Sequence, residues 1–336
     1  MTIKYKPRTS IRGDNRGSGH FSLTLVLVII SVFAVVGIFK NVSSHADSSV
    51  ESIRSGIKGE CLDDKDDILK PDAKLDLYGC NGSDAQGWQI KDASITHDNL
   101  CLAIKNQSVN VGSQAVLGNC DQNNPSEVWL VNDNGLYNPN SKLCLSSSSQ
   151  QNGSSLVLAD CGGLGKSQEV WQTNWTSVDC PSSTKGQKIA CAAINEWVNW
   201  HRPNANHTSL LTSYTDNAPY EEWCADFVSY VYKEAGYPFT GGETNGWDEN
   251  NANNILNMGF SMHSDLSSYS PQVGDVAYFN YEGGHVEIVI SGGKTPTFLY
   301  GNSATIDPAT GNGQMEANTI INDGNLGSLM YYLSPN

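Results

Sequence analysis

A repeat of about 41 residues runs through the middle of this chain. A Cys-Leu dipeptide begins at Cys61, Cys101 and Cys144, at intervals of 40 and 43 residues. A tryptophan recurs near the end of each copy, at intervals of 41 and 42 residues. Within the copies, short alternating runs such as AKLDLYG and SQAVLGN indicate strands, and helical periodicity is missing. Because one copy cannot bury its own apolar face, the three copies are expected to close on one another as an all-β domain.

The cysteine count indicates an oxidising compartment. Six of the nine cysteines fall into evenly spaced pairs inside the copies, at separations of 19, 19 and 17 residues. These pairs are Cys61 with Cys80, Cys101 with Cys120, and Cys144 with Cys161, and Cys180 with Cys191 makes a short fourth. An exported chain with an odd count leaves one cysteine unpaired or bonded to another molecule, and here Cys224 is left over. Zinc held by cysteines is disfavoured, because the sequence has no CxxC pair and no histidines at ligand spacing beside the cysteines.

The N-terminal segment predicts export. Five basic residues between Lys4 and Arg16 precede an uncharged run from Phe21 to Phe39. As a helix these residues would rise roughly 28 Å, close to the thickness of a bilayer's hydrocarbon core. The basic flank would stay inside the cell and the remainder would lie outside. The run exceeds the usual core of a signal peptide, so a retained anchor is preferred over a signal cleaved after it.

The charge of the exported part argues against a nucleic-acid partner. Residues 1–40 carry a net charge of +5 and the whole chain carries −15, so the remainder carries −20. Such a surface repels the phosphate backbone. Residues 40–55 follow as a polar, serine-rich linker without periodicity.

The repeated part resembles the ricin B-type lectins. In that family a β-trefoil consists of three repeats of this length, each with a Cys-Leu start, an internal disulfide and a Gln-x-Trp end. Here the end is QGW in the first copy and EVW in the second and third, and the resemblance covers about residues 56–175. It implies a trefoil fold and a disulfide inside each copy. The repeat-end tryptophans are expected in the core rather than in a ligand site.

The resemblance implies at most one sugar site. In the family, such a site uses an aspartate after the Cys-Leu, an aromatic residue two positions before the second cysteine, and an asparagine just before the Gln-x-Trp. The first copy keeps Asp63 and Tyr78 together with Gln86, but Ala85 replaces the asparagine. The other two copies lack both the aspartate and the aromatic residue. A trefoil retained as a spacer or a protein-binding module is the alternative.

A predicted amphipathic helix in the C-terminal half begins at the leftover cysteine. The stretch EEWCADFVSYVYKEAGYPF carries apolar residues at helical spacing, and Gly236 and Pro238 end the helix near Ala235. Cys224 then lies in the first turn, where the helix dipole and unpaired backbone N–H groups favour the thiolate, whereas the preceding glutamates oppose it. A second helix is predicted over residues 187–200. Because a free cysteine is more often an inert core residue, a catalytic role requires a partner base.

The histidine that can supply this base begins a predicted strand. Three strands are expected, in VGDVAYFNY, HVEIVIS and PTFLYGN. If residues 292–295 form a hairpin loop, Ser291 pairs with Pro296, and the same register places His285 opposite Asn302. The asparagine oxygen would accept a hydrogen bond from one ring nitrogen and leave the other for the thiol. Glu287 lies on the same face and is the alternative orienting residue.

Other titratable residues in this half are expected to be structural. Asp226 and Asp275 would hold the helix start and a turn. His201, His207 and His263 lie in polar stretches typical of solvated loops. Only His285 follows a Gly-Gly turn at a strand start, which favours it as the base.

The C-terminal part resembles the CHAP family, the cysteine- and histidine-dependent amidohydrolases and peptidases of the papain-like NlpC/P60 group. The similarity spans about residues 185–336 through WCADFVSYV, PQVGDVAYF, GGHVEIVI and LYGN. It implies an α+β papain-like fold with Cys224 as nucleophile, His285 as base and Asn302 as the orienting residue. Many relatives have an acidic residue two positions before that asparagine, where this chain has Tyr300, so the third member is the least determined.

The sequence therefore predicts a multidomain exported protein. Its parts are a basic segment (1–20), a transmembrane anchor or signal core (21–39), a linker (40–55), an all-β trefoil (56–175) and an α+β CHAP-like domain (176–336). The expected function is cleavage of amide bonds in peptidoglycan stem or cross-bridge peptides by a Cys/His mechanism without metal or cofactor, with the trefoil for glycan targeting. The alternative is a surface carbohydrate-binding adhesin with an inactive papain-like domain. Expected partners are peptidoglycan or another surface glycan or peptide, and the membrane through residues 21–39, which places the protein outside the cytoplasm, anchored or secreted.

Overall fold

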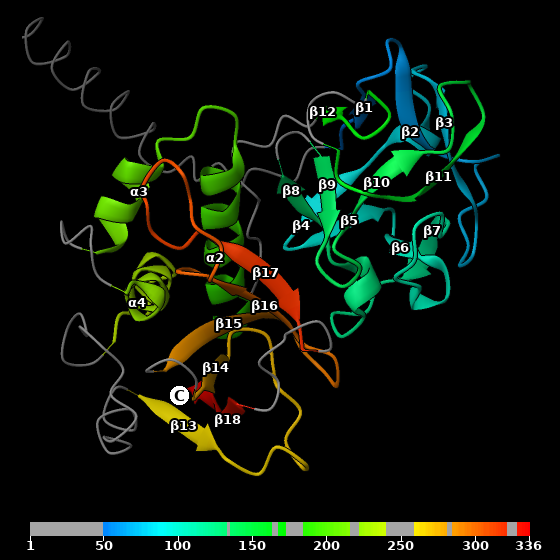
Figure 1. The fold of residues 1–336 in the computed structure, drawn as a ribbon. Helices are drawn as coiled ribbons and strands as arrows, with labels where there is room; N and C mark the ends of the chain where they lie inside the picture. Colours follow the sequence, from blue (N-terminus) through cyan, green and yellow to red (C-terminus); the bar gives the residue numbers. More distant parts are fainter. Residues whose placement is uncertain are drawn as a thin grey trace, which may run out of the picture. The chain divides into compact units, whose positions relative to one another are not determined.

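The computed structural model describes residues 50–132, 135–162, 167–172, 184–215, 222–239, 259–280, 284–320 and 328–336 (Figure 1). The predicted basic segment, the anchor at residues 21–39 and most of the linker lie outside the described residues and stay predictions. Within the described ranges, no helix combines the length and the apolar character that crossing a membrane requires. Residues 48–336 form one compact unit, which contains a β-rich part and a mixed helix–sheet part.

Antiparallel strands build the β-rich part. They are β1 (Arg54–Ser55), β2 (Glu60–Asp64), β3 (Leu75–Gly79), β4 (Gln89–Lys91), β5 (Ser94–His97), β6 (Leu100–Ile104), β7 (Ala115–Asn119), β8 (Leu130–Asn132), β9 (Gly135–Asn138), β10 (Leu143–Ser147), β11 (Ser154–Ala159) and β12 (Trp171–Gln172). Each copy of the repeat contributes one long hairpin, formed by β2 with β3, β6 with β7, and β10 with β11. Each hairpin begins with a Cys-Leu pair, because the leucine points into the core and the cysteine bonds across the hairpin.

The three hairpins close into a ring, as the repeat predicts. Their second strands meet pairwise, through Lys74 with Val116, Gln114 with Val157, and Ser154 with Leu77. The repeat-end tryptophans are buried in one apolar cluster, which confirms their expected place in the core. The structure forms the three disulfides inside the copies, and Cys191 is also disulfide-bonded, while its predicted partner Cys180 lies outside the described residues.

The C-terminal part packs helices against an antiparallel sheet. Its helices are α2 (Lys185–His201), α3 (His207–Tyr214) and α4 (Cys224–Glu234), and its strands are β13 (Phe260–His263), β14 (Val276–Phe279), β15 (His285–Ser291), β16 (Thr297–Tyr300), β17 (Glu316–Thr319) and β18 (Leu329–Pro335). The strand order is β13-β18-β14-β15-β16-β17. Both predicted helices and the three predicted strands are present. Helix α3 was not predicted, so the expectation of a solvated loop around His207 is wrong; Asn206 caps this helix by accepting from the N–H of Ser209 at 3.0 Å.

Alternation along the strands gives this sheet two buried faces. Val276, Val286 and Ile288 belong to the cluster that includes the apolar faces of α2 and α4. Phe279, Val289 and other residues of the opposite parity form a second cluster on the other face. Strand β15 is therefore buried along its whole length, which explains why it contains valine and isoleucine at consecutive positions.

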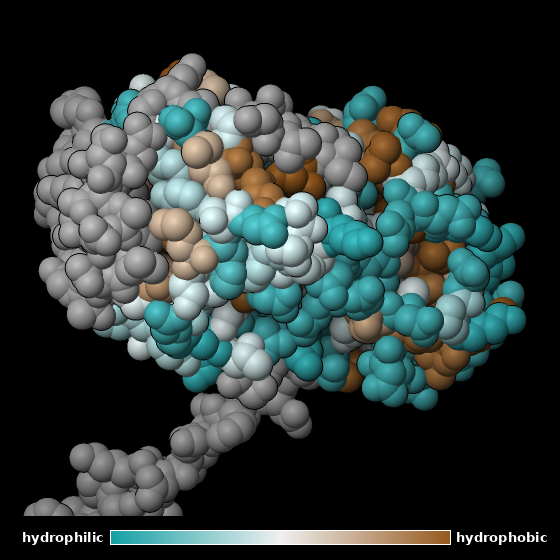
Figure 2. Space-filling model, turned by 90° about the horizontal axis from the view of Figure 1, so that it is seen from below, coloured by the Kyte–Doolittle hydropathy of each residue, from teal (hydrophilic) through white to brown (hydrophobic). Residues whose placement is uncertain are grey.

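The surface is largely hydrophilic on the face that Figure 2 shows, with smaller hydrophobic areas between. The large apolar side chains that the described residues expose include Ile68, Leu69 and Tyr78 of the first copy of the repeat. Single exposed apolar side chains are normal on a soluble surface. Tyr78 differs because its ring borders a pocket, described below.

Candidate active site

Helix α4 begins at Cys224, and the thiol of this residue is free and buried, with 8% of the residue exposed. The helix starts here because Trp223 takes a non-helical backbone conformation and apolar residues such as Phe227 and Val231 recur on the face packed on the sheet. The first backbone N–H groups of a helix have no partner within the helix. They are therefore available near the sulfur.

Burial controls the ionisation of this thiol. It raises the pKa of Cys224 to about 11. The backbone N–H groups of Val286 and Ala225 donate to the sulfur and lower the pKa, while the carboxylates of Glu222 and Asp226 raise it. The stabilisation of a thiolate that the helix start predicts is thus outweighed by desolvation. At neutral pH the resting group is the thiol.

His285 is the first residue of β15, next to the residue whose N–H reaches the sulfur. The residue is 5% exposed, and burial lowers the pKa of its ring to about 4. The ring meets that of Tyr300 nearly at a right angle, with 5.1 Å between centroids. Its Nε2 lies 3.6 Å from Oε1 of Glu287. Thiol and imidazole thus come from packed elements, and both are neutral at pH 7.

Side chains alternate along the start of β15. Val286 belongs to the cluster beneath the helices, whereas His285 and Glu287 have the parity of Val289 on the other face. The contact that the structure gives between Cys224 and this strand is therefore to the backbone at Val286. The ring of His285 contacts Tyr300 and Glu287 at the end of the strand.

The predicted register of the β15–β16 hairpin is confirmed in its middle. The pairs there are Ile288 with Leu299 and Val289 with Phe298. Nearer the loop, Ser291 pairs with Thr297 and not with Pro296, so the predicted four-residue loop is wrong by one residue. The cause is a bulge in this hairpin, which inserts one unpaired residue.

Asn302 lies just beyond the end of β16. Its backbone is left-handed, with φ of +59°. The preceding Gly301 packs directly on the ring of Trp223. Only glycine fits there, because a Cβ at this position would lie 2.1 Å from the ring. This packing brings the start of the loop to the residue before Cys224. The ring of His285 contacts Glu287 and Tyr300. The orienting role of Asn302 stays a prediction.

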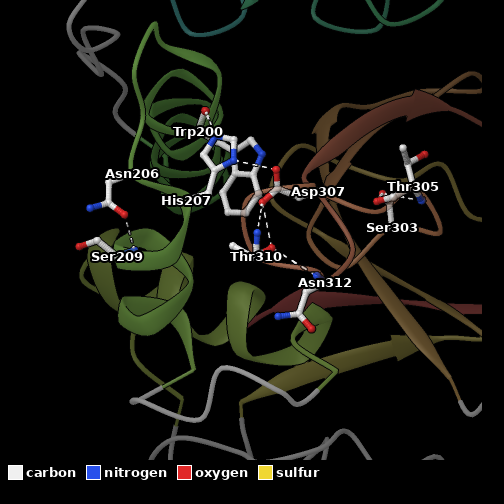
Figure 3. A network of polar contacts seen from close by, with 9 residues as sticks. All are labelled: Trp200, Asn206, His207, Ser209, Ser303, Thr305, Asp307, Thr310 and Asn312. Atoms are coloured by element: carbon white, nitrogen blue, oxygen red, sulfur yellow. Dashed lines mark hydrogen bonds and ion pairs between the residues drawn. The ribbon is translucent and has the colours of Figure 1, made fainter.

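A partly buried ion pair fixes the loop that follows Asn302 (Figure 3). Nδ1 of His207 lies 2.9 Å from Oδ1 of Asp307, and its Nε2 lies 2.8 Å from the carbonyl oxygen of Trp200. Both ring nitrogens face acceptors, so the ring makes both bonds as an imidazolium. Burial alone would raise the pKa of Asp307, but hydrogen bonds from His207 and Thr310 outweigh it and lower the pKa. Sequence reasoning missed this cluster, although Asn206 before a Leu-Leu pair was a helix-start signal.

Asp275, in the motif before β14, holds a turn as predicted. Its Oδ2 accepts from the hydroxyl of Tyr269 at 2.6 Å and from the N–H of Gln272 at 2.8 Å. Burial raises the pKa of this carboxyl. Tyr232 of α4 donates to the carbonyl of Gly274 at 2.6 Å, so the same turn also seats the cysteine-bearing helix.

In the trefoil, the first residue of the Gln-x-Trp motif, glutamine or glutamate, makes the same hydrogen bond in every copy. It accepts a backbone N–H from the loop after the second strand: Gln86 from Asn81 at 2.9 Å, Glu127 from Asp121 at 2.8 Å, and Glu169 from Gly162 at 2.7 Å. In the first copy Gln86 also donates to Oδ1 of Asp63 at 2.9 Å. The other copies have alanine or serine at the aspartate position and glutamate in place of the glutamine. The glutamine is thus needed where the aspartate is kept.

The predicted sugar residues come together in the first copy. Asp63 and Tyr78 line a pocket of about 350 Å³ together with Ala85, which takes the place of the family's asparagine. Tyr78 is 43% exposed, whereas Asp63 is buried, with its carboxylate held by Gln86. Burial raises the pKa of Asp63. A ring open to solvent beside a fixed carboxylate suits stacking on a pyranose, and the sugar role stays a prediction.

Comparison with known proteins finds two families in succession. The family model of the ricin-type β-trefoil lectin domain matches residues 49–171, and that of the CHAP domain matches residues 213–302. This order of domains is the one that the sequence predicts, and it is confirmed. No curated protein sequence matches the chain.

Several solved structures are similar to part of this chain. A designed three-fold symmetric protein, ThreeFoil, is 19% identical, with a TM-score of 0.34 over 36% of this chain and 94% of its own. An agglutinin from Abrus precatorius is 23% identical, with a TM-score of 0.34 over 39% of this chain and 51% of its own. The C-half of an earthworm R-type lectin, solved with GalNAc, is 16% identical, with a TM-score of 0.32 over 37% of this chain and 96% of its own.

Proposed function

We propose, from a ricin-type lectin domain followed by a CHAP domain in one chain, that this protein is a thiol hydrolase cutting amide bonds in peptidoglycan stem or cross-bridge peptides. The observation that carries the proposal is the free Cys224 at the start of α4, packed against the strand that begins at His285. In this proposal the protein acts outside the cytoplasm, anchored through residues 21–39 or secreted. The trefoil holds it near glycan and so raises its local concentration on the substrate.

The pKa values bear on how the nucleophile is activated. With Cys224 at about 11 and His285 at about 4, moving the proton from sulfur to ring before substrate binds would cost roughly 10 kcal/mol. A preformed thiolate–imidazolium pair is therefore not the resting state. In this proposal the proton leaves the sulfur as the carbonyl carbon is attacked, and His285 receives it as general base. The ring, which rests against Tyr300 and Glu287, has to turn toward the sulfur for this transfer.

The remaining steps follow from the same groups. Backbone N–H groups at the start of α4 stabilise the oxyanion of the tetrahedral intermediate. The imidazolium then protonates the leaving amine, which leaves a thioester on Cys224. Water attacks the thioester as His285 takes its proton, and the ring returns that proton to the departing sulfur. By the resemblance Asn302 orients the ring, while the 3.6 Å contact favours Glu287 for this role.

Zymography on purified cell wall tests the proposal. The wild-type protein is expected to clear the wall, and Cys224→Ala to leave it intact while still binding it. Mass spectrometry of the released fragments then identifies the bond: new amino and carboxyl ends within the peptide indicate an endopeptidase, and release of whole stem peptides from the sugar indicates an amidase. Absence of clearing by a folded wild-type protein contradicts the proposal.

The buried thiol supports one other function. With Cys224 only 8% exposed and the pKa of its thiol at about 11, the C-terminal domain has the properties of an inactive relative. The protein would then be a surface carbohydrate-binding adhesin. In that case the wild type and Cys224→Ala bind glycan equally, neither clears the wall, and Tyr78→Ala abolishes binding.

A further inference from the structure

A buried histidine and a buried aspartate face each other where the first copy of the trefoil meets the second. Asp64 ends β2 and is fully buried, and His97 ends β5 and is 3% exposed. Nε2 of His97 lies 3.9 Å from Oδ2 of Asp64. Among the residues that the structure describes, Nε2 of His97 has no hydrogen-bond partner. Neither carboxylate oxygen of Asp64 accepts a bond of good geometry, although the backbone N–H groups of Ile68 and Leu69 face this carboxylate and lower its pKa. A polar group buried in this way normally has a ligand, a water or a partner.

The other copies of the repeat show what this place normally holds. The residue equivalent to Asp64 is Ile104 in the second copy and Ser147 in the third, each the fourth residue from the cysteine that begins the hairpin. The strand pairing makes Asn138 the equivalent of His97. The fold therefore needs no ionisable residue at either position. A buried carboxylate where a sister copy has isoleucine costs stability unless something compensates it.

The tautomer of His97 leaves a lone pair directed at Asp64. Nδ1 lies 2.8 Å from the carbonyl oxygen of Gly87, and a carbonyl only accepts, so Nδ1 carries the hydrogen. In the neutral ring Nε2 is then an acceptor that faces another acceptor. A histidine whose second nitrogen donates to a backbone carbonyl is the usual arrangement at a metal site.

We propose that Asp64 and His97, with Asp67, bind a divalent ion of the zinc type. The ligand atoms of these three residues lie within 4.8 Å of one another. Bonds from zinc to imidazole nitrogen and to carboxylate oxygen are each about 2.0–2.2 Å, so the 3.9 Å between Nε2 and Oδ2 can be spanned by one ion. An imidazole ligand favours zinc over calcium or magnesium, which select oxygen. Asp67 is exposed, so water can complete the coordination on that side.

The site would act on the neighbouring pocket. Asp64 and Asp67 line the same pocket as Asp63 and Tyr78. Asp67 belongs to a turn that its own N–H closes on the carbonyl of Asp64 at 2.9 Å, and an ion joining the turn to His97 would hold it against β5. The ion would also offset the repulsion between the carboxylates of Asp64 and Asp67. Burial is the main cause that raises the pKa of Asp64, and the charge of Asp67 raises it further, whereas His97 lowers it. The inference itself does not depend on sugar binding or on hydrolysis.

Zinc titration of the full-length protein tests this site. Every variant carries Cys224→Ala, so that the free thiol does not bind zinc, and the protein is stripped with EDTA before calorimetry with zinc chloride at pH 7. The background protein is expected to bind one equivalent that His97→Asn and Asp64→Ile lose or bind at least tenfold more weakly. Asp64→Ile copies the second repeat and is expected to fold without metal. Asp98→Asn removes a nearby exposed acid and is expected to keep the equivalent.

The thermal midpoint gives a second reading of the same variants. Zinc is expected to raise the midpoint of the background protein and of Asp98→Asn but not that of Asp64→Ile. Unchanged stoichiometry and affinity in His97→Asn and Asp64→Ile would overturn the proposal. Absence of zinc binding by the background protein at millimolar zinc would also overturn the proposal. His97 and Asp64 would then form an ion pair with each other and no metal site.

Discussion

The backbone N–H of Val286 donates a hydrogen bond to the sulfur of Cys224, and this contact ties the start of α4 to β15 one residue from His285. The donor favours a negative charge on the sulfur, yet desolvation outweighs it. The resting sulfur is therefore a neutral thiol at pH 7. The pH dependence of the reactivity of Cys224 distinguishes a neutral resting thiol from a preformed thiolate–imidazolium pair.

Alkylation of Cys224 is expected to follow a pKa of about 11. Since iodoacetamide reacts with the thiolate, about one molecule in 10⁴ is reactive at pH 7, and the rate should rise about tenfold per pH unit up to pH 10. Stopped-time labelling followed by mass spectrometry of the peptide that contains Cys224 measures the rate. The disulfide-bonded cysteines should stay unlabelled without reductant.

Cys224→Ala is the control for labelling, and His285→Gln tests the coupling. Because the ring is neutral in the resting state, His285→Gln should leave the alkylation profile nearly unchanged while abolishing hydrolysis. A rate that levels off near pH 7 in the wild type, and falls in His285→Gln, would instead demonstrate a preformed ion pair.

Glu287 and Asn302 compete for the role of orienting His285, and a pair of substitutions distinguishes them. Glu287→Gln keeps the shape of the side chain that contacts the ring at 3.6 Å but removes its charge. Asn302→Gly removes the amide and keeps the left-handed backbone, which glycine adopts without strain. We expect Glu287→Gln to lower kcat by about 10²-fold and Asn302→Gly by less than tenfold, with KM unchanged in both.

The backbone at residue 302 supplies the control for that comparison. Asn302→Ala removes the same amide as Asn302→Gly but strains the left-handed conformation. If the alanine variant loses activity and the glycine variant does not, the backbone matters and the amide does not. A larger loss of kcat in Asn302→Gly than in Glu287→Gln would assign the orienting role to the asparagine.

The fold was predictable because its signals are periodic. The spacing of the Cys-Leu pairs and of the tryptophans predicts three copies of one unit. In the structure, strand contacts made by Lys74, Gln114 and Ser154 join these copies into a closed ring. Likewise the apolar spacing after Cys224 and the stop at Gly236 gave α4, and the alternation after His285 gave β15. In each case one residue type recurs at the period of the element that buries it.

The ionisation states were not predictable, because they depend on burial from distant elements. The sequence places Cys224 at a helix start but not beneath β15, where desolvation raises its pKa. It also does not show that Asp64 and His97, 33 positions apart, end strands of two different sheets and bring their side chains within 3.9 Å of each other. His207 was assigned to a loop because its ion-pair partner, Asp307, is 100 residues away.

Glu127 makes the trefoil's stability depend on pH. Burial raises its pKa to about 7 from an ordinary value near 4.5, despite hydrogen bonds from the N–H of Asp121 and the amide of Asn124. The folded state thus binds a proton that the unfolded state releases between pH 4.5 and 7, so this residue's contribution to stability falls as pH rises through that window. Glu127→Gln cannot ionise and should gain up to about 3 kcal/mol relative to the wild type between pH 4.5 and pH 8.

The measurement is the difference in thermal midpoint between Glu127→Gln and the wild type at pH 4.5 and at pH 8. Asp84→Asn removes one acid from the surface of the trefoil and should show the same difference at both pH values. The glutamine can reproduce the bonds of Gln86, which accepts a loop N–H and donates to the carbonyl of Gly79. A difference that is independent of pH would show that Glu127 is ionised throughout.

The ion pair of His207 with Asp307 is expected to stabilise the loop that starts at Asn302. Asp307→Asn leaves a cationic ring without its counter-charge in a site where the aspartate is 3% exposed, so the loss should be roughly 2 kcal/mol. The folded state lowers the pKa of Asp307. The stabilisation by the ion pair should therefore be present above pH 4 and be lost as the pH falls below it. Thr310→Val removes the hydrogen bond that a neutral hydroxyl donates to the same carboxylate and keeps the ion pair, so it should cost about half as much. Urea unfolding at pH 7 and pH 3 compares the two variants with the wild type. Equal stability of the two variants at pH 7 would show that the charge on Asp307 contributes nothing. The loop packs through Gly301 on Trp223, the residue before Cys224, so Asp307→Asn should also lower kcat.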